Sequence, residues 1–158
     1  MDILIVSDTH RVISDVVDLI RRRDFDIYVH LGDMVYDAEE IERITGERFI
    51  KIKGNNDFFD RDTPEEHILK VANYRIMLVH GHRQNVHYTK DQLVYLAKEN
   101  LCDIIIYGHT HEYVNTKIDG IWVLNPGSTT NPRGGDFERG CIVLSIDGDK
   151  AEVERLIF

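Results

Sequence analysis

The chain has 158 residues, about the length of one domain, so we expect residues 1–158 to form a single domain that needs no disulfide to fold. Its 28 acidic and 19 basic residues give a formal net charge of −9, which disfavours nucleic-acid binding and docking on an anionic membrane, because both depend on basic patches. Apolar residues make up 42% and come in repeated runs, which excludes disorder as the main state.

Strands and helices alternate in the first half of the chain. Residues 2–7 form an apolar run typical of a strand; it is too short for a secretory signal and follows no basic residue, so we expect a cytoplasmic protein. Apolar residues at helical spacing predict helices over 12–23 and 37–45, and strand-like runs occupy 26–31 and 48–53. This order is typical of a parallel sheet with crossover helices.

The second half contains more strands, which are joined by turns. One further amphipathic helix is predicted over 89–100, and Asp-Gly turns between apolar runs indicate hairpins. The predicted strands are 66–72, 74–80, 103–107, 112–118, 121–124, 140–146 and 151–157. We therefore expect a parallel α/β half that merges into an antiparallel half, with two packed sheets flanked by helices.

Five of the apolar runs are followed immediately by residues that can bind a metal ion. The five segments are Asp8-Thr9-His10, Gly32-Asp33, Gly54-Asn55-Asn56-Asp57, His80-Gly81-His82 and Gly108-His109-Thr110-His111. Ligands of open α/β sheets bind beyond the carboxyl ends of the strands, so we expect these loops to converge on one edge. Each motif alone is typical of an ordinary turn or a solvated loop. The five together predict a metal site.

The order of these motifs resembles the calcineurin-like metallophosphoesterase superfamily, and the motifs span residues 5–111. The length and the lack of insertions resemble the small bacterial and archaeal phosphodiesterase branch, to which the eukaryotic retromer scaffold subunit is related. The resemblance implies a two-sheet β-sandwich flanked by helices and a hydrolase of small-molecule phosphodiesters. A nuclease is disfavoured, because the chain has neither an added capping domain nor the basic surface that duplex substrates require.

The resemblance also implies which residues hold metal ions. Asp8, His10 and His111 would bind a first ion, Asn55, His80 and His109 a second, and Asp33 would bridge both. Imidazole, carboxylate and amide ligands suit divalent Mn²⁺, Fe²⁺, Co²⁺, Ni²⁺ or Zn²⁺. Two such ions lower the pKa of a bridging water, and the resulting hydroxide would attack phosphorus in line with the leaving group.

One position departs from the family pattern. Many members carry a histidine after the metal-binding asparagine, where it is thought to protonate the leaving group; this chain has Asn56, whose amide cannot deliver a proton at pH 7. His82 is the candidate acid in its place. Asp57 is expected to orient the Gly54–Asn56 loop or a histidine. Aryl diesters, whose leaving groups need little protonation, are therefore the expected substrates.

Other polar residues near the motifs have plainer interpretations. His30 lies inside an apolar run and is expected to be a hydrogen-bonded core histidine, while His67 and His87 are expected at the surface. The segment Asn125-Pro126-Gly127-Ser128 either borders the site, as a similar loop does in this branch, or is a tight turn. Arg133 either meets a substrate phosphate or is simply exposed.

The alternative function is a metal-binding scaffold of the same fold that binds partners without physiological catalysis. Lost ligands would favour the scaffold, whereas the expected residue stands at all seven ligand positions. The sequence is also compatible with a homo-oligomer.

Overall fold

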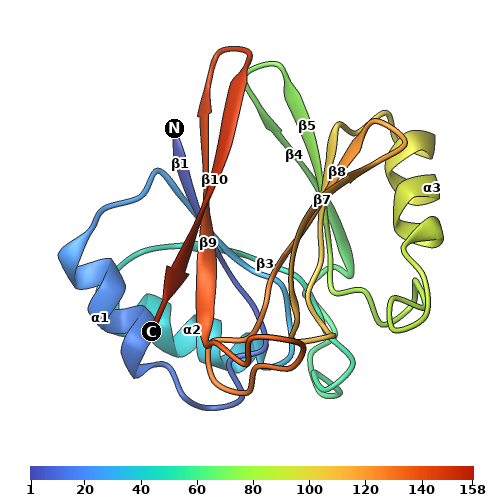
Figure 1. The fold of residues 1–158 in the computed structure, drawn as a ribbon. Helices are drawn as coiled ribbons and strands as arrows, with labels where there is room; N and C mark the ends of the chain where they lie inside the picture. Colours follow the sequence, from blue (N-terminus) through green and yellow to red (C-terminus); the bar gives the residue numbers. More distant parts are fainter.

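Two five-stranded sheets pack face to face in the computed structural model, which describes residues 1–158 (Figure 1). Helices α1 (Ser14–Arg22) and α2 (Val35–Thr45) cover the outer face of the first sheet, and α3 (Asp91–Glu99) covers the outer face of the second. The prediction of a two-sheet sandwich flanked by helices is confirmed. None of the helices combines the length and apolar character that a bilayer crossing requires.

The first sheet combines the N-terminal strands with the C-terminal hairpin. Its order is β10-β9-β1-β2-β3. Strands β1 (Asp2–Val6), β2 (Ile27–His30) and β3 (Phe49–Lys51) run parallel, as the alternation of strands and helices predicted. The hairpin of β9 (Gly140–Asp147) and β10 (Lys150–Ile157) adds antiparallel to β1, so the two ends of the chain share one sheet.

The second sheet, ordered β4-β5-β6-β8-β7, corrects one expectation. Strands β4 (Glu66–Val71) and β5 (Tyr74–Val79) form an antiparallel hairpin, as do β7 (Tyr113–Ile118) and β8 (Ile121–Pro126). However, β5, β6 (Ile104–Ile106) and β8 are parallel to one another, so the second half is antiparallel only within its hairpins. The reason is that α3 forms a crossover between β5 and β6, which requires parallel strands.

Alternating side chains divide the core into three layers. Inward-facing residues of both sheets, such as Ile5 of β1 and Ile76 of β5, share one buried cluster between the sheets. The intervening residues face the helices: Leu4 packs in a cluster with Val16 of α1. On the other sheet, Val79 and α3 share the third cluster. Successive residues of a strand point to opposite faces, so central strands such as β1 and β6 are buried on both sides, whereas the edge strands β7 and β10 are partly exposed.

Helix α2 begins two residues earlier than the sequence pattern indicated, because its cap comes from a distant loop. The Asp57 carboxylate accepts the backbone N–H groups of Met34 (3.0 Å) and Val35 (2.7 Å), which are free at the start of the helix. Met34, the residue before the helix, has φ 92°. A carboxylate that caps a helix from 22 residues away leaves no local signal in the sequence.

Candidate metal centre

The five loops that carry the predicted ligands meet at one end of the sandwich, at the lower edge in Figure 1. Three of them follow β1, β2 and β3 of the first sheet, and two follow β5 and β6 of the second sheet. The loops therefore converge as predicted, but they come from the carboxyl ends of strands in two packed sheets rather than in one open sheet. The predicted ligands form two clusters.

The first cluster consists of Asp8, His10 and His111, whose candidate ligand atoms all lie within 4.8 Å of one another. Nε2 of His111 lies 3.2 Å from Nε2 of His10 and 3.2 Å from Oδ1 of Asp8. Oδ2 of Asp8 accepts hydrogen bonds from Ser7 and from the backbone of His109, whereas the buried Oδ1 makes none. An unpaired, buried carboxylate oxygen beside two imidazole nitrogens fits a divalent cation.

The second cluster consists of Asp33, His80 and His109, again within 4.8 Å of one another, with Asn55 beside them. Nε2 of His80 lies 3.3 Å from Oδ1 of Asp33 and 3.1 Å from the amide oxygen of Asn55. The His80 and His109 rings are 5.1 Å apart at their centroids. Imidazole, carboxylate and amide groups thus face one small volume, which is the donor set that divalent transition metals bind.

Two of the histidines are oriented by backbone carbonyl groups. The carbonyl of Leu31 lies 2.7 Å from Nδ1 of His80, and that of Asn131 lies 2.6 Å from Nδ1 of His111. A carbonyl oxygen only accepts hydrogen bonds, so Nδ1 carries the proton in both rings and Nε2 faces its cluster. This arrangement is common for histidines that bind metals, because the bond at one ring nitrogen fixes the direction of the other.

The ionisable groups of the second cluster shift one another's pKa values. Burial alone would raise the pKa of Asp33, but the hydrogen bond and charge of His80 lower it well below the usual range, so Asp33 is an anion at neutral pH. Burial, helped by the charge of His80, lowers the pKa of His109 to about 4 and leaves that ring neutral. Asp33 and His109 are thus in the protonation states that metal binding requires. Burial would lower the pKa of His80, but the hydrogen bond to Asp33 and the charges of Asp8 and Asp33 raise it, so an ion bound here would displace a proton from this ring.

Strained backbone is concentrated in these loops. Few residues other than glycine adopt a positive φ, although Asp, Asn and His do so more readily than most. Five of the seven predicted ligands have positive φ, and so do their neighbours Arg11 and Met34. The five ligands are Asp8 (54°), His10 (42°), Asp33 (53°), His109 (64°) and His111 (61°). Sparsely populated conformations of this kind cluster at functional sites.

Two glycines allow the loops to approach one another closely. A Cβ atom at Gly54 would collide with the backbone and side chain of Asp33. At Gly108 it would collide with Ser7 and would lie 2.8 Å from Oδ2 of Asp8. The glycines in these two motifs therefore let one ligand-bearing loop pack directly against another.

Asp57 and Asn56 both lie where the second and third loops meet. The Asp57 carboxylate accepts four backbone N–H groups, from Asp33 (3.1 Å), Gly54 (2.8 Å), Met34 and Val35. Asn56 donates its backbone N–H to Oδ1 of Asp33 (2.9 Å) and its side-chain amide to Oδ2 (2.6 Å). Asp57 therefore joins the two loops through their backbones, and Asn56 holds the Asp33 carboxylate.

His82 lies next to the second cluster. Its ring centroid is 5.4 Å from that of His80 and 6.3 Å from that of His109, and its buried Nδ1 has no hydrogen-bond partner. Burial, together with the charge of His80, lowers the pKa of His82. The residue is thus placed near the predicted ligands, but it is mainly neutral near pH 7.

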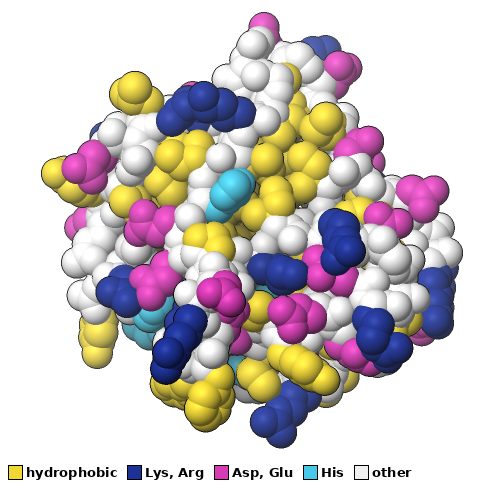
Figure 2. Space-filling model, turned by 180° about the vertical axis from the view of Figure 1, so that it is seen from behind, with side chains coloured by type: hydrophobic (Ala, Val, Ile, Leu, Met, Phe, Trp, Pro, Cys, Tyr) yellow, Lys and Arg dark blue, Asp and Glu magenta, His cyan; other side chains and the backbone are white.

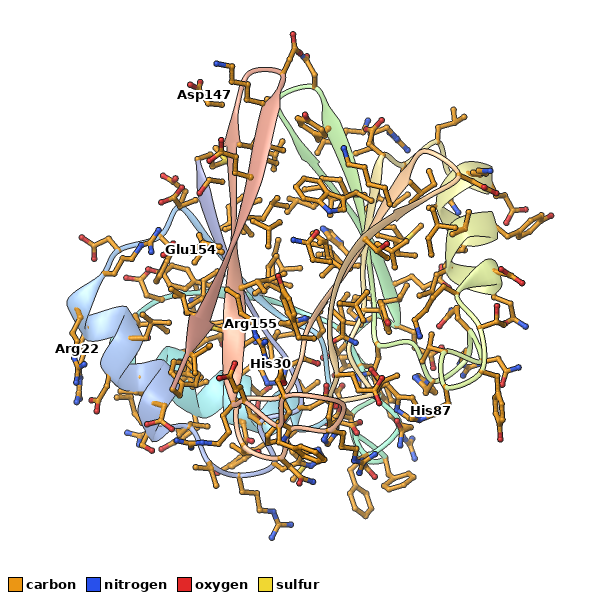
Figure 3. All side chains as sticks on the ribbon, in the orientation of Figure 1. Arg22, His30, His87, Asp147, Glu154 and Arg155 are labelled. Carbon is orange, nitrogen blue, oxygen red and sulfur yellow. The ribbon has the colours of Figure 1, made fainter.

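Buried hydrogen bonds connect the loops after β1 and β2 to one another and to α2, and they were not predicted from the sequence. Thr9 donates to the Asp37 carboxylate (2.6 Å), which also accepts the backbone N–H of Arg11 (2.7 Å). His30 accepts the N–H of Gly32 at Nδ1 (3.2 Å), so its Nε2 donates to Thr9 (3.1 Å). His30 lies in the interior, as predicted, and burial lowers its pKa to about 4 (Figure 3). Asp37 had the sequence signal of an ordinary acidic residue in the first turn of a helix.

Two further segments border the centre. His87, which Figure 3 labels, is exposed, as predicted. Its ring centroid nevertheless lies 4.7 Å from that of His109, a contact that only the folded structure reveals. Ser128 donates to the carbonyl of Asp8 (2.7 Å), and Asn125 donates to the carbonyl of Gly108 (2.9 Å). The Asn125–Ser128 segment therefore borders the site. His67, expected at the surface, is half-buried in β4.

The fold and the convergent loops define the class of protein. Residues 1–149 match the family described as the calcineurin-like phosphoesterase superfamily domain, so the chain belongs to this superfamily. The resemblance inferred from the five motifs is confirmed. Membership agrees with the two clusters of candidate ligands at the loop ends.

Individual relatives carry related names. "Probable metallophosphoesterase YsnB" of Bacillus subtilis is 30% identical over 155 residues, which cover 97% of this chain and 89% of that protein. A phosphodiesterase of Methanocaldococcus jannaschii is 30% identical over 145 residues, covering 80% of this chain and 83% of that one. The zinc complex of Vps29 from Entamoeba histolytica superposes with a TM-score of 0.82 over 99% of both chains; at 21% identity this likeness shows the shared fold alone.

Proposed function

We propose that this protein is a phosphodiesterase that hydrolyses small-molecule diesters with two divalent transition-metal ions. The first ion would be held by Asp8, His10 and His111, and the second by Asn55, His80 and His109, with Asp33 shared between them. The observation that carries the proposal is the pair of ligand clusters, each within 4.8 Å, built from loops that are far apart in the sequence. The phosphodiesterase of M. jannaschii, similar over 80% of this chain, supports the reaction class.

The residues present fit such ions. Oδ1 of Asp8 is buried and unpaired, and the Nε2 atoms of His80 and His111 face their clusters because Nδ1 donates to a carbonyl. Bound there, two divalent ions would activate water and stabilise the negative charge that develops on the phosphate oxygens. Mn²⁺, Fe²⁺, Co²⁺, Ni²⁺ and Zn²⁺ all suit this donor set.

The neighbouring residues have separate roles in the proposal. Asn56 holds both oxygens of Asp33, and Asp57 positions the loops that carry Asp33 and Asn55. His82 is the candidate proton donor by position, but its lowered pKa leaves little of the protonated form near neutral pH. We therefore expect good turnover of diesters with aryl leaving groups, which need little protonation, and slow turnover of alkyl esters.

Residues 1–158 act as one domain in this proposal, because both sheets contribute to the central core and to each ligand cluster. A cytoplasmic location stays a prediction from the sequence, which is also compatible with a homo-oligomer. The scaffold alternative differs in one outcome: the protein would bind metal without turning over phosphate esters.

Turnover of bis(p-nitrophenyl) phosphate by metal-free protein and by protein reloaded with each divalent metal tests the proposal. We expect no hydrolysis after metal removal verified by elemental analysis, and restoration by at least one of the five metals. The variant His67→Ala, a histidine of β4 outside both clusters, should keep wild-type activity. Unchanged hydrolysis by the metal-free protein would contradict the mechanism, and metal binding without turnover of any ester would support the scaffold.

A further inference from the structure

A pocket of about 940 Å³ opens beside the candidate metal centre. It shares His10 and Asn56 with the centre, and three aromatic side chains, Tyr36, Phe58 and Phe59, line it. We call this cavity the aromatic pocket. Its volume is within the range of cavities that bind small organic molecules.

The loops that carry the ligands, together with the first residues of α2, form the wall of the aromatic pocket. Tyr36 lies three residues after Asp33, and Phe58 lies three residues after Asn55. Arg11 follows His10 directly and lines the pocket as well. The aromatic pocket therefore adjoins the proposed metal centre, and a group attached to a phosphate there would lie beside it.

The wall that bears Phe58 and Phe59 is held by its own hydrogen bonds. Asp57 ties its start to the loop that carries Asp33. Further along, the Asp60 carboxylate accepts the backbone N–H groups of Asp62 (2.9 Å) and Thr63 (3.0 Å), and Lys53 donates to the carbonyl of Asp60. Hydrogen bonds thus hold the backbone on both sides of Phe58 and Phe59.

The aromatic side chains of the pocket have little cover from the protein itself. Tyr36 is 72%, Phe58 75% and Phe59 99% exposed. Figure 2 shows hydrophobic side chains along the same lower edge of the molecule at which the loops lie in Figure 1. Large apolar side chains gathered at a cavity beside a reactive centre are typical of a binding surface, because a ligand would remove them from water.

We propose that the aromatic pocket binds a planar aromatic ring carried by the substrate, so that the substrate is a small phosphodiester bearing an aryl group or a nucleobase. This inference rests on the proposed phosphodiesterase function. Aromatic side chains stack on planar rings, and a guanidinium such as that of Arg11 or Arg61 adds a favourable contact with a ring face. The acidic residues Glu39 and Asp62, also in the lining, disfavour a polyanionic chain and favour a single nucleotide or aryl ester.

Binding of three phosphonates to the Mn²⁺-loaded protein tests the inference without turnover, because the carbon–phosphorus bond is not hydrolysed as an ester. Phenylphosphonate, cyclohexylphosphonate and methylphosphonate share the charged group and differ in the attached group. We expect calorimetry to give about tenfold tighter binding of the phenyl compound than of the methyl compound, with the cyclohexyl compound between them. The variants Phe58→Ala and Phe59→Ala should each reduce the phenyl preference at least threefold, whereas Tyr95→Ala, an exposed tyrosine on α3, should leave it unchanged.

Equal affinity for the three phosphonates, no binding of any of them, or a phenyl preference that survives both phenylalanine variants would overturn the inference. Thymidine 5′-monophosphate and a short thymidine oligonucleotide distinguish a free nucleotide from a nucleic acid, and tighter binding of the oligonucleotide would overturn the assignment to small molecules. Hydrolysis of bis(p-nitrophenyl) phosphate is measured in parallel. A phenyl preference without hydrolysis would support the aromatic pocket and contradict the phosphodiesterase function. Hydrolysis without a phenyl preference would support the phosphodiesterase function and contradict the role of the aromatic pocket.

Discussion

The two sheets contribute different chemistry to the candidate metal centre. The first sheet supplies every carboxylate and amide among the predicted ligands, in the loops after β1, β2 and β3. The second sheet supplies only imidazoles, from His80, His109 and His111. The loops of the first sheet are joined by the buried carboxylates of Asp37 and Asp57, whereas backbone carbonyls orient two of the imidazoles.

This division shows why the centre depends on the packing of the two sheets. In the first cluster, Asp8 and His10 come from the first sheet and His111 from the second. In the second cluster, Asp33 comes from the first sheet and His80 and His109 from the second. Negative charge on one side therefore faces neutral or cationic rings on the other, and neither sheet holds a complete ligand set alone.

The largest effect is expected at the carboxylate proposed to be shared. Asp33→Asn should lower kcat on bis(p-nitrophenyl) phosphate by about 10³-fold at saturating Mn²⁺, because it removes charge next to both proposed ions. His111→Ala and Asn55→Ala each alter one cluster and should cost less. Steady-state kinetics of the three variants measures the difference. Near wild-type turnover of Asp33→Asn would show that Asp33 is not the bridge.

The next effect is a gain for a subset of substrates. Asn56→His introduces a proton donor beside the second cluster and should raise turnover of alkyl esters by about 10²-fold, the lower end of the range for one positioned acid. Aryl esters, which need little protonation, should change much less. Rates on esters with graded leaving-group pKa measure this selectivity. A uniform loss across the series would mean instead that Asn56 serves only to hold Asp33.

Removal of the carboxylate that joins two loops of the first sheet should affect stability. Asp57→Asn replaces one acceptor oxygen by an N–H₂ group that faces backbone donors, so we expect the free energy of unfolding to fall by about 2–3 kcal/mol. The control Asp60→Asn, at a half-buried carboxylate that accepts two N–H groups, should cost about 1 kcal/mol or less. Urea unfolding measures both, and equal costs would contradict the joining role of Asp57.

A smaller effect concerns pH. His30 is buried, and its pKa falls from 6.5 in the unfolded chain to about 4 in the folded protein. Between these values the unfolded state binds the extra proton, so stability is lost as the pH falls below about 6.5. The loss due to His30 should be about 2 kcal/mol between pH 7 and pH 5. His30→Gln, which does not titrate, should lack this part of the slope in urea titrations; an identical slope would show that His30 does not cause it.

Patterns within single segments were sufficient to predict much of the molecule. The runs that became β1, β2, β3, β5 and β6 were identified from apolar residues, and the ligand motifs directly after them were visible as metal-capable groups. The parallel pairing of β6 with β8 was missed, because β7, which lies between them in sequence, pairs on the far side of β8.

Features that depend on contacts between distant segments were missed. Asp57 caps α2 from another loop, Asp37 binds Thr9 across 28 residues, and His87 meets His109 only in the folded chain. The aromatic pocket was missed for the same reason: Tyr36 lies in the first turn of α2, whereas Phe58 and Phe59 lie in the loop after β3. Local periodicity carries no information about such pairings.

The central claim is that loops of both sheets together hold two metal ions. Elemental analysis of protein dialysed against Mn²⁺ tests it most directly, with the variant His111→Ala compared with the wild type. We predict two ions per chain in the wild type and one in His111→Ala, because that variant removes the second sheet's contribution to the first cluster. A wild type that holds fewer than two ions, or a variant that retains both, would contradict the claim.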